Sequence, residues 1–175
     1  AVSDIAAMAG KPLATLASVV LPQTASKSDV DALCSGLNNS ATRVGAPLVG
    51  GDIAIHRDAS HPLTVSVTVL GTPVEPGPVL RSGGQAGDLL VVTGVLGGSL
   101  DSDGDGPHLD FSPRVQEALW LRAQYGEQLH AMIDISDGLG RDTGRLAESS
   151  GVVAAIESAM IPCRGGASVE QAMSD

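Results

Sequence analysis

The chain has 175 residues, 43% hydrophobic and 17% charged, which is the composition of a globular protein with a sizeable core. Twenty acidic against ten basic residues give a formal net charge of −10 at pH 7, which disfavours nucleic acid and anionic membranes as partners. Cys34 and Cys163 are too few for a disulfide framework, so we expect free thiols in a reducing compartment.

No apolar run reaches the length that spans a membrane, and no charged segment followed by an apolar one marks a signal peptide. We therefore expect a cytoplasmic protein that binds no membrane. Because the sequence starts without Met in a segment of helical character, we also expect it to be a piece of a longer protein.

The first predicted elements are a helix and a strand. Residues 1–9 have a helical pattern, which Gly10 and Pro12 end. Residues 13–21 are an apolar run typical of a buried strand, and Pro22 closes it.

A long helix is predicted next. Ser26 is a candidate N-cap, and Asp29 adds an acidic residue to the first turn. Four apolar residues then follow at spacings of three and four, which predicts one buried helix face made of Val30, Leu33, Leu37 and Ala41. Gly45 ends this helix.

Two strands complete the first half of the chain. Residues 46–49 are a short apolar strand that leads into Gly51 and Asp52. Residues 63–70 alternate apolar and polar side chains, as a half-buried strand does. Residues 1–74 are therefore predicted to form a half of mixed α and β structure.

A domain boundary is predicted after this half. Three prolines between residues 72 and 78 exclude a central strand or a helix there. We therefore place a linker at residues 75–79 and the beginning of a second α+β half at residues 80–175.

The second half is predicted to alternate strands and helices. Ser112 and Pro113 are typical of an N-cap and a first helical residue, which predicts a helix that runs to Gly126. The other expected elements are strands at 89–93, 131–133 and 151–156 and a helix at 139–149.

One acidic loop resembles the first half of a calcium-binding loop. Residues 101–106 alternate Asp with small residues and have Gly at the sixth position. The twelfth position is Ser112 instead of the required Glu, so we interpret this segment as a solvated surface loop.

Three short motifs with carboxylates are the strongest candidates for chemistry. They are Ser3-Asp4, Gly50-Gly51-Asp52 and Asp134-Ile135-Ser136-Asp137. Asp52 and Asp134 are predicted to stand at the C-terminal ends of apolar strands, where α/β sheets often bind ligands. Oxygen ligands beside the free N–H groups of a helix start suit a hard cation that holds a phosphate. The alternative is that Ser and Asp serve as helix caps and turn residues.

The order and spacing of several motifs resemble the thiamine-monophosphate kinases, a family in the superfamily of aminoimidazole ribonucleotide synthetase. The resemblance covers nearly all 175 residues. The motifs that carry it are Ser3-Asp4-Ile5-Ala6-Ala7-Met8, Val49-Gly50-Gly51-Asp52, Arg81-Ser82-Gly83 with Gly87-Asp88, Val92-Thr93-Gly94, and Ile133-Asp134-Ile135-Ser136-Asp137-Gly138-Leu139.

This resemblance implies a two-domain, PurM-like α+β fold. The N-terminal half would be a mixed sheet that pairs with a second copy across a β-barrel, so a homodimer is expected. The implied reaction transfers the γ-phosphate of ATP directly to thiamine monophosphate, giving thiamine diphosphate and ADP. It would use several Mg²⁺ ions, with ATP as co-substrate.

The resemblance also implies the roles of individual residues. The expected Mg²⁺ ligands are Asp4, Asp52, Asp134 and Asp137, and the expected ATP contacts are Gly51, Asp52, Arg81 and Ser136. No residue is expected to act as a nucleophile or general base, because the acceptor is already an anionic phosphate and Mg²⁺ with Arg81 neutralises the charge.

The sequence also departs from the family pattern. Ile53 stands where the family has Thr, and further metal-binding and thiamine-pocket motifs of the family lie outside this sequence. Two alternatives therefore stay open: another ATP-dependent enzyme of the superfamily with a different acceptor, and a non-catalytic dimerisation or metal-binding fragment.

Overall fold

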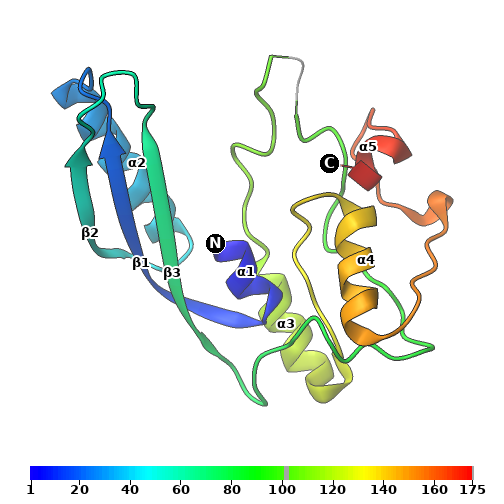
Figure 1. Cartoon of the computed structure of the whole chain (residues 1–175). Coiled ribbons are helices and arrows are strands. Elements are labelled where there is room, and N and C mark those ends of the chain that lie inside the picture. The colour runs from blue at the N-terminus through cyan, green and yellow to red at the C-terminus, as the bar shows by residue number, and fades with distance from the viewer. Residues whose placement is uncertain (101–102, 175) are drawn as a thin grey trace.

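The computed structural model describes residues 1–100 and 103–174 and has an α+β architecture. A sheet with one long helix forms one end of the molecule, and shorter helices joined by irregular segments form the other (Figure 1). The elements of the first part are α1 (Val2–Ala7), β1 (Gly10–Leu21), α2 (Lys27–Arg43), β2 (Leu48–Ile55) and β3 (Thr64–Pro73). The expected acidic loop at 101–106 begins outside the described residues.

The sheet is mixed and has three strands in the order β2-β1-β3. Strand β1 pairs in parallel with β2 and antiparallel with β3. The predicted α+β class and mixed sheet are thus confirmed. The described strands form an open sheet and no barrel.

Helix α2 begins where its capping residues predict. The Ser26 side chain accepts the N–H of Asp29, and the Asp29 side chain accepts the N–H of Ser26, which is a capping box. The expected buried helix face is less buried than predicted, because only Ala41 is buried and Val30, Leu33 and Leu37 are half-buried.

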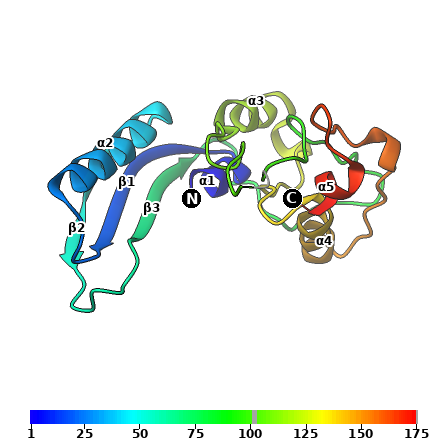
Figure 2. The same cartoon turned by 90° about the horizontal axis from the view of Figure 1, so that it is seen from above.

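Helix α2 covers one face of the sheet and leaves the other open (Figure 2). Ala17 and Val19 of β1 are buried, whereas Ser18 between them is exposed, so the α2 face carries the odd-numbered residues of β1. The register pairs Ala17 with Val67 and Val19 with Val65. The predicted apolar alternation of β3 therefore lies on the α2 face, but Val65 and Val67 are exposed instead of half-buried as expected. The expected dimer stays a prediction.

The second part of the chain contains helices α3 (Val115–Tyr125), α4 (Leu139–Ser150) and α5 (Val169–Ser174) and the short 3-10 turns η1 (Gly126–Gln128) and η2 (Ser158–Met160). Helix α4 confirms the helix predicted at 139–149. Helix α3 starts two residues later than predicted, after Arg114, so Ser112 and Pro113 precede it. No helix in the described residues is both long and apolar enough to cross a membrane.

The strands predicted at 89–93, 131–133 and 151–156 were wrong. These segments are irregular, and the side chains of Leu89 and Val153 are 89% and 95% exposed. An apolar run becomes a strand only when neighbouring strands satisfy its backbone N–H and C=O groups. The described residues provide no such neighbours in this part of the chain.

Helix α1 packs against α3, although the sequence places them in different halves. Ala6, Val115 and Ala118 form a buried apolar cluster between these helices. Gly77 of the predicted linker is also held against α3, because Arg122 of this helix donates a hydrogen bond to the Gly77 carbonyl over 2.9 Å. The domain boundaries themselves stay a prediction.

The pairing of β1 with β2 predicts a specific requirement for Gly51. A Cβ atom at Gly51 would collide with the backbone of Ala17 on the neighbouring strand. We expect Gly51→Ala to lower the free energy of unfolding by about 3 kcal/mol or more, since backbone atoms cannot move aside as side chains do. Urea unfolding followed by circular dichroism measures the change.

Gly36→Ala is the matched control. Gly36 lies inside α2 with no atom within 4 Å of an added Cβ, so this variant should be more stable by about 0.5–1 kcal/mol. Equal stability of Gly51→Ala and the unmodified chain would contradict the close contact.

Candidate functional site

Asp4, the first expected Mg²⁺ ligand, lies in the first turn of α1. Its carboxylate is 60% exposed, so it is accessible to a cation.

Gly51 and Asp52 lie inside strand β2. The prediction that Asp52 stands at the end of a strand was wrong, because the ladder with β1 continues through the glycines to Ile55. Asp52 pairs with Ser18, which pairs on its other side with Ser66. These three exposed residues form a row across the open face of the sheet.

The acidic turn, residues 134–137, precedes helix α4. Asp134 is half-buried in an irregular segment instead of at the end of the predicted strand, while Ser136 and Asp137 are exposed. The N-cap of α4 is Gly138, and no side chain caps the helix. The capping alternative for Ser136 and Asp137 is therefore not what the structure shows.

A buried carboxylate holds this turn from behind. Asp142 of α4 is 1% exposed, and its Oδ2 accepts the N–H groups of Ser136 and Asp137, each over 2.8 Å. Its Oδ1 accepts a hydrogen bond from Arg145 over 2.8 Å, and the same guanidinium nitrogen pairs with Asp137. Sequence reasoning missed Asp142. The acidic residue in the first turn of a helix and Arg145 three residues later were the available signals.

Hydrogen bonds keep the Asp142 carboxylate ionised despite its burial. Burial raises the pKa of Asp142, but the N–H groups of Asp137 and Ser136 and the Arg145 guanidinium together lower it below the ordinary value of 3.8. The pKa of Arg145 is raised in turn by its hydrogen bonds to Asp137 and Asp142. The turn therefore rests on a fixed negative charge.

The segment that carries Arg81 runs beside the approach to the acidic turn. The N–H of Met132 donates to the carbonyl of Leu80 over 3.0 Å, and His130 pairs with Asp88 over 2.9 Å. The hydroxyl of Ser150, at the end of α4, donates to the carbonyl of Arg81 over 3.0 Å. The structure thus brings the Arg81 motif and the acidic turn onto one framework, with Arg81 itself exposed.

The expected Mg²⁺ ligands are only partly brought together. Asp134 and Asp137 share one turn, whereas Asp4 and Asp52 lie on α1 and on the distant sheet (Figure 1). Within residues 1–100 and 103–174, no three His, Cys, Asp or Glu side chains are grouped closely enough to hold a metal ion. A common metal site of all four carboxylates stays a prediction.

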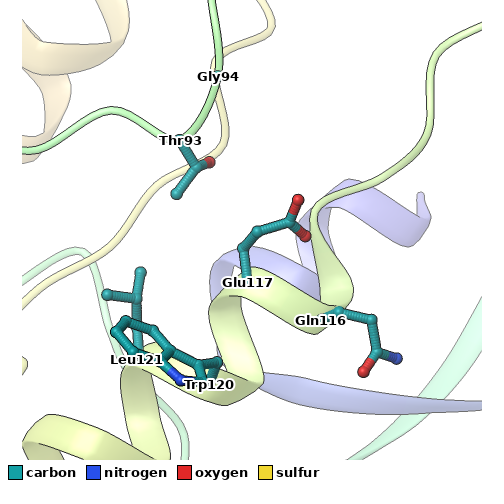
Figure 3. A pocket seen from close by; sticks show the side chains of 6 residues that line it. All are labelled: Thr93, Gly94, Gln116, Glu117, Trp120 and Leu121. Atoms are coloured by element: carbon teal, nitrogen blue, oxygen red, sulfur yellow. The ribbon is translucent and has the colours of Figure 1, made fainter.

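A cavity of about 590 Å³ lies between the Thr93-Gly94 motif and helix α3. Trp120, Glu117 and Leu121 project from the helix toward the motif, as Figure 3 shows. The sequence analysis identified Thr93 and Gly94 only as part of a family motif and did not predict this cavity. Glu117 is already paired with Arg114 over 2.9 Å, so it does not present a free charge there.

Comparison with known proteins matches residues 1–72 to the family described as AIR synthase related protein, N-terminal domain. A thiamine-monophosphate kinase of Rhodopirellula baltica is 36% identical over 160 residues, covering 91% of this chain and 47% of that protein. The structure of AaThiL complexed with AMPPCP and TMP is 27% identical with a TM-score of 0.74, covering 99% of this chain and 61% of that chain.

The structure of hydrogenase maturation protein HypE has a TM-score of 0.78 at 16% identity and covers 99% of this chain and 60% of that chain, which is a likeness of fold alone. Residues 1–72, which form the sheet and the helices beside it, therefore resemble the N-terminal domain of AIR synthase-related proteins. The chain is a homologue of the thiamine-monophosphate kinases, as the motifs predicted. It spans about half the length of the curated relatives it matches.

The role of Asp142 in holding the turn is testable by its removal. Asp142→Ala leaves two backbone N–H groups and one guanidinium without their acceptor, so the free energy of unfolding should fall by about 1–3 kcal/mol. Glu148→Ala removes an exposed carboxylate from the same helix and should change stability little. Equal losses in both variants would show that the hydrogen bonds of Asp142 contribute nothing.

The lowered pKa of Asp142 also predicts a pH dependence. Its folded-state pKa lies below the ordinary 3.8, so its contribution to stability is complete above that pH and is lost as the pH falls through the lower folded-state value. Thermal unfolding midpoints between pH 5 and pH 2 should therefore fall more steeply for the unmodified chain than for Asp142→Asn. Parallel curves would contradict the lowered pKa.

Proposed function

We propose that the chain carries part of a thiamine-monophosphate kinase, which transfers the γ-phosphate of ATP to thiamine monophosphate and releases ADP. The observation that carries this proposal is the acidic turn held by Asp142 beside the Arg81 segment, in a homologue of these kinases. The complex of AaThiL with AMPPCP and TMP supports a nucleotide and a phosphate acceptor as ligands.

The proposed cofactor is Mg²⁺, with ATP as co-substrate. Carboxylate oxygens are the ligands that Mg²⁺ prefers, and the ion keeps several waters, so two carboxylates on one turn suit it. Asp134 and Asp137 would hold one ion there, and Asp4 and Asp52 are the further proposed ligands. A bound Mg²⁺ neutralises negative charge on the transferred phosphoryl group.

The residues of this chain would bind and orient, and none would take part covalently. The acceptor phosphate is already anionic, so positioning and charge neutralisation dominate catalysis. The backbone N–H groups of Ser136 and Asp137 are occupied by Asp142, so the proposed nucleotide contact of Ser136 falls to its exposed hydroxyl. Arg81 is exposed and would pair with phosphate oxygens. The backbone of Gly51 is a further proposed contact of the nucleotide. Asp52 would act there as a ligand of Mg²⁺.

The family resemblance further supports a PurM-like dimer in the cytoplasm. We propose that the open sheet β2-β1-β3 contributes to a barrel with a second copy, since β2 and β3 are both edge strands here. A second candidate function is that of another ATP-dependent enzyme of the superfamily with a different acceptor, because the family that residues 1–72 match is that of AIR synthase-related proteins.

The kinase activity is testable with the purified protein, ATP, Mg²⁺ and thiamine monophosphate. We expect ADP to be released only when thiamine monophosphate is present, as followed by a coupled assay. Asp134→Asn should abolish this release, because it removes a charged ligand of the proposed Mg²⁺ ion.

Asp31→Asn is the control. Asp31 is an exposed carboxylate on α2 that pairs with Lys27, so its removal should leave turnover unchanged. Full turnover of Asp134→Asn would contradict the proposed site, and ATP binding without dependence on thiamine monophosphate would favour the second candidate function.

A further inference from the structure

Two carboxylates of the turn region share one cation. The Nη1 atom of Arg145 lies 2.8 Å from Oδ1 of Asp142 and also contacts Oδ2 of Asp137. Arg145 is thus the counter-ion of Asp137, a proposed metal ligand. For Asp137 to offer both oxygens to a cation, this contact must break.

The two contacts of Arg145 differ in strength because their partners differ in burial. Asp142 is 1% exposed, so its bond to Arg145 lies in a poorly solvated environment and resists exchange. The side chains of Asp137 and Arg145 are 41% and 46% exposed, so their pair is weak and solvent competes for it. An incoming cation would therefore separate Arg145 from Asp137 before it separates Arg145 from Asp142.

The charges around the turn favour such an exchange. Asp134 has no hydrogen-bond or ion-pair partner among the described residues, so its carboxylate is free to take a cation. Asp142 keeps the N–H groups of Ser136 and Asp137 in place during the exchange, since neither of these bonds involves the Asp137 carboxylate. The backbone of the turn is thus held while the Asp137 side chain changes partner.

We propose that Arg145 occupies the place of a divalent cation at Asp137, and that a metal ion displaces it while Asp142 retains it beside the turn. This inference rests on the proposed function, which places Mg²⁺ at Asp134 and Asp137. The displaced guanidinium stays within the site, where it is a positive group available to phosphate oxygens.

The exchange predicts that loss of Arg145 strengthens metal binding. Arg145→Gln keeps an N–H donor for Asp142 but removes the positive charge that competes at Asp137. We expect the dissociation constant for Mn²⁺, used as the probe and measured by electron paramagnetic resonance, to fall roughly two- to fivefold, as the weakness of exposed ion pairs implies. Circular dichroism of the variant verifies that it is folded.

Arg141→Gln separates this local competition from the general effect of charge. Arg141 is an exposed residue of the same helix, and its side chain makes no hydrogen bond or ion pair with the turn among the described residues. Arg141→Gln removes the same charge as Arg145→Gln but no competitor at Asp137. It should therefore change Mn²⁺ affinity less than Arg145→Gln does.

Three results would overturn the inference, and they are distinguishable. Equal Mn²⁺ affinity in the unmodified chain and Arg145→Gln, or weaker affinity in the variant, would leave the proposed metal site standing and reject the competition. An equal gain in Arg141→Gln would reduce the effect to net charge. Absence of Mn²⁺ binding in every protein would reject the proposed metal site together with the inference.

Discussion

The hydrogen bonds accepted by the buried Asp142 carboxylate are the interaction on which the candidate site depends. They satisfy the backbone N–H groups of Ser136 and Asp137, which precede the N-cap of α4, and they hold the acidic turn against the helix. A single buried charge is stable here only because donors surround it on both oxygens. The Asp137 carboxylate can then remain exposed, since it does not support the backbone of the turn.

Two acidic residues of this region therefore lie in opposite environments. Asp142 is inaccessible and fully hydrogen-bonded, whereas Asp137 five residues earlier is exposed and held only by an exchangeable partner. The guanidinium of Arg145 pairs with both carboxylates, so one cation of α4 neutralises a buried and an exposed acidic residue. The sequence motif includes the exposed Asp137 but does not extend to the buried Asp142.

Several elements in both halves were predictable because their signals are local. The capping box at Ser26 and Asp29 and the limits of α4 follow from residue types at fixed spacings. The strand predictions that failed depended on neighbouring strands. Residues 89–93 and 151–156 have the composition of strands, but no neighbouring strand is present among the described residues. Asp52 was misplaced because the glycines before it suggested a turn, whereas Gly51 lies inside β2 and lets β1 approach closely. Asp142 was missed because burial of a charge has no local signature.

The packing of α1 on α3 affects how the protein responds to proteolysis. Asp4 belongs by sequence to the first half, yet Ala6 of the same helix is buried against Val115 and Ala118 of the second. The long strand β1 therefore connects a helix fixed to one part with a sheet in the other. Cleavage at residues 75–79 would leave α1 attached to the sheet fragment. Separation of the two products would expose the apolar faces of α1 and α3, so the products should remain associated after proteolysis.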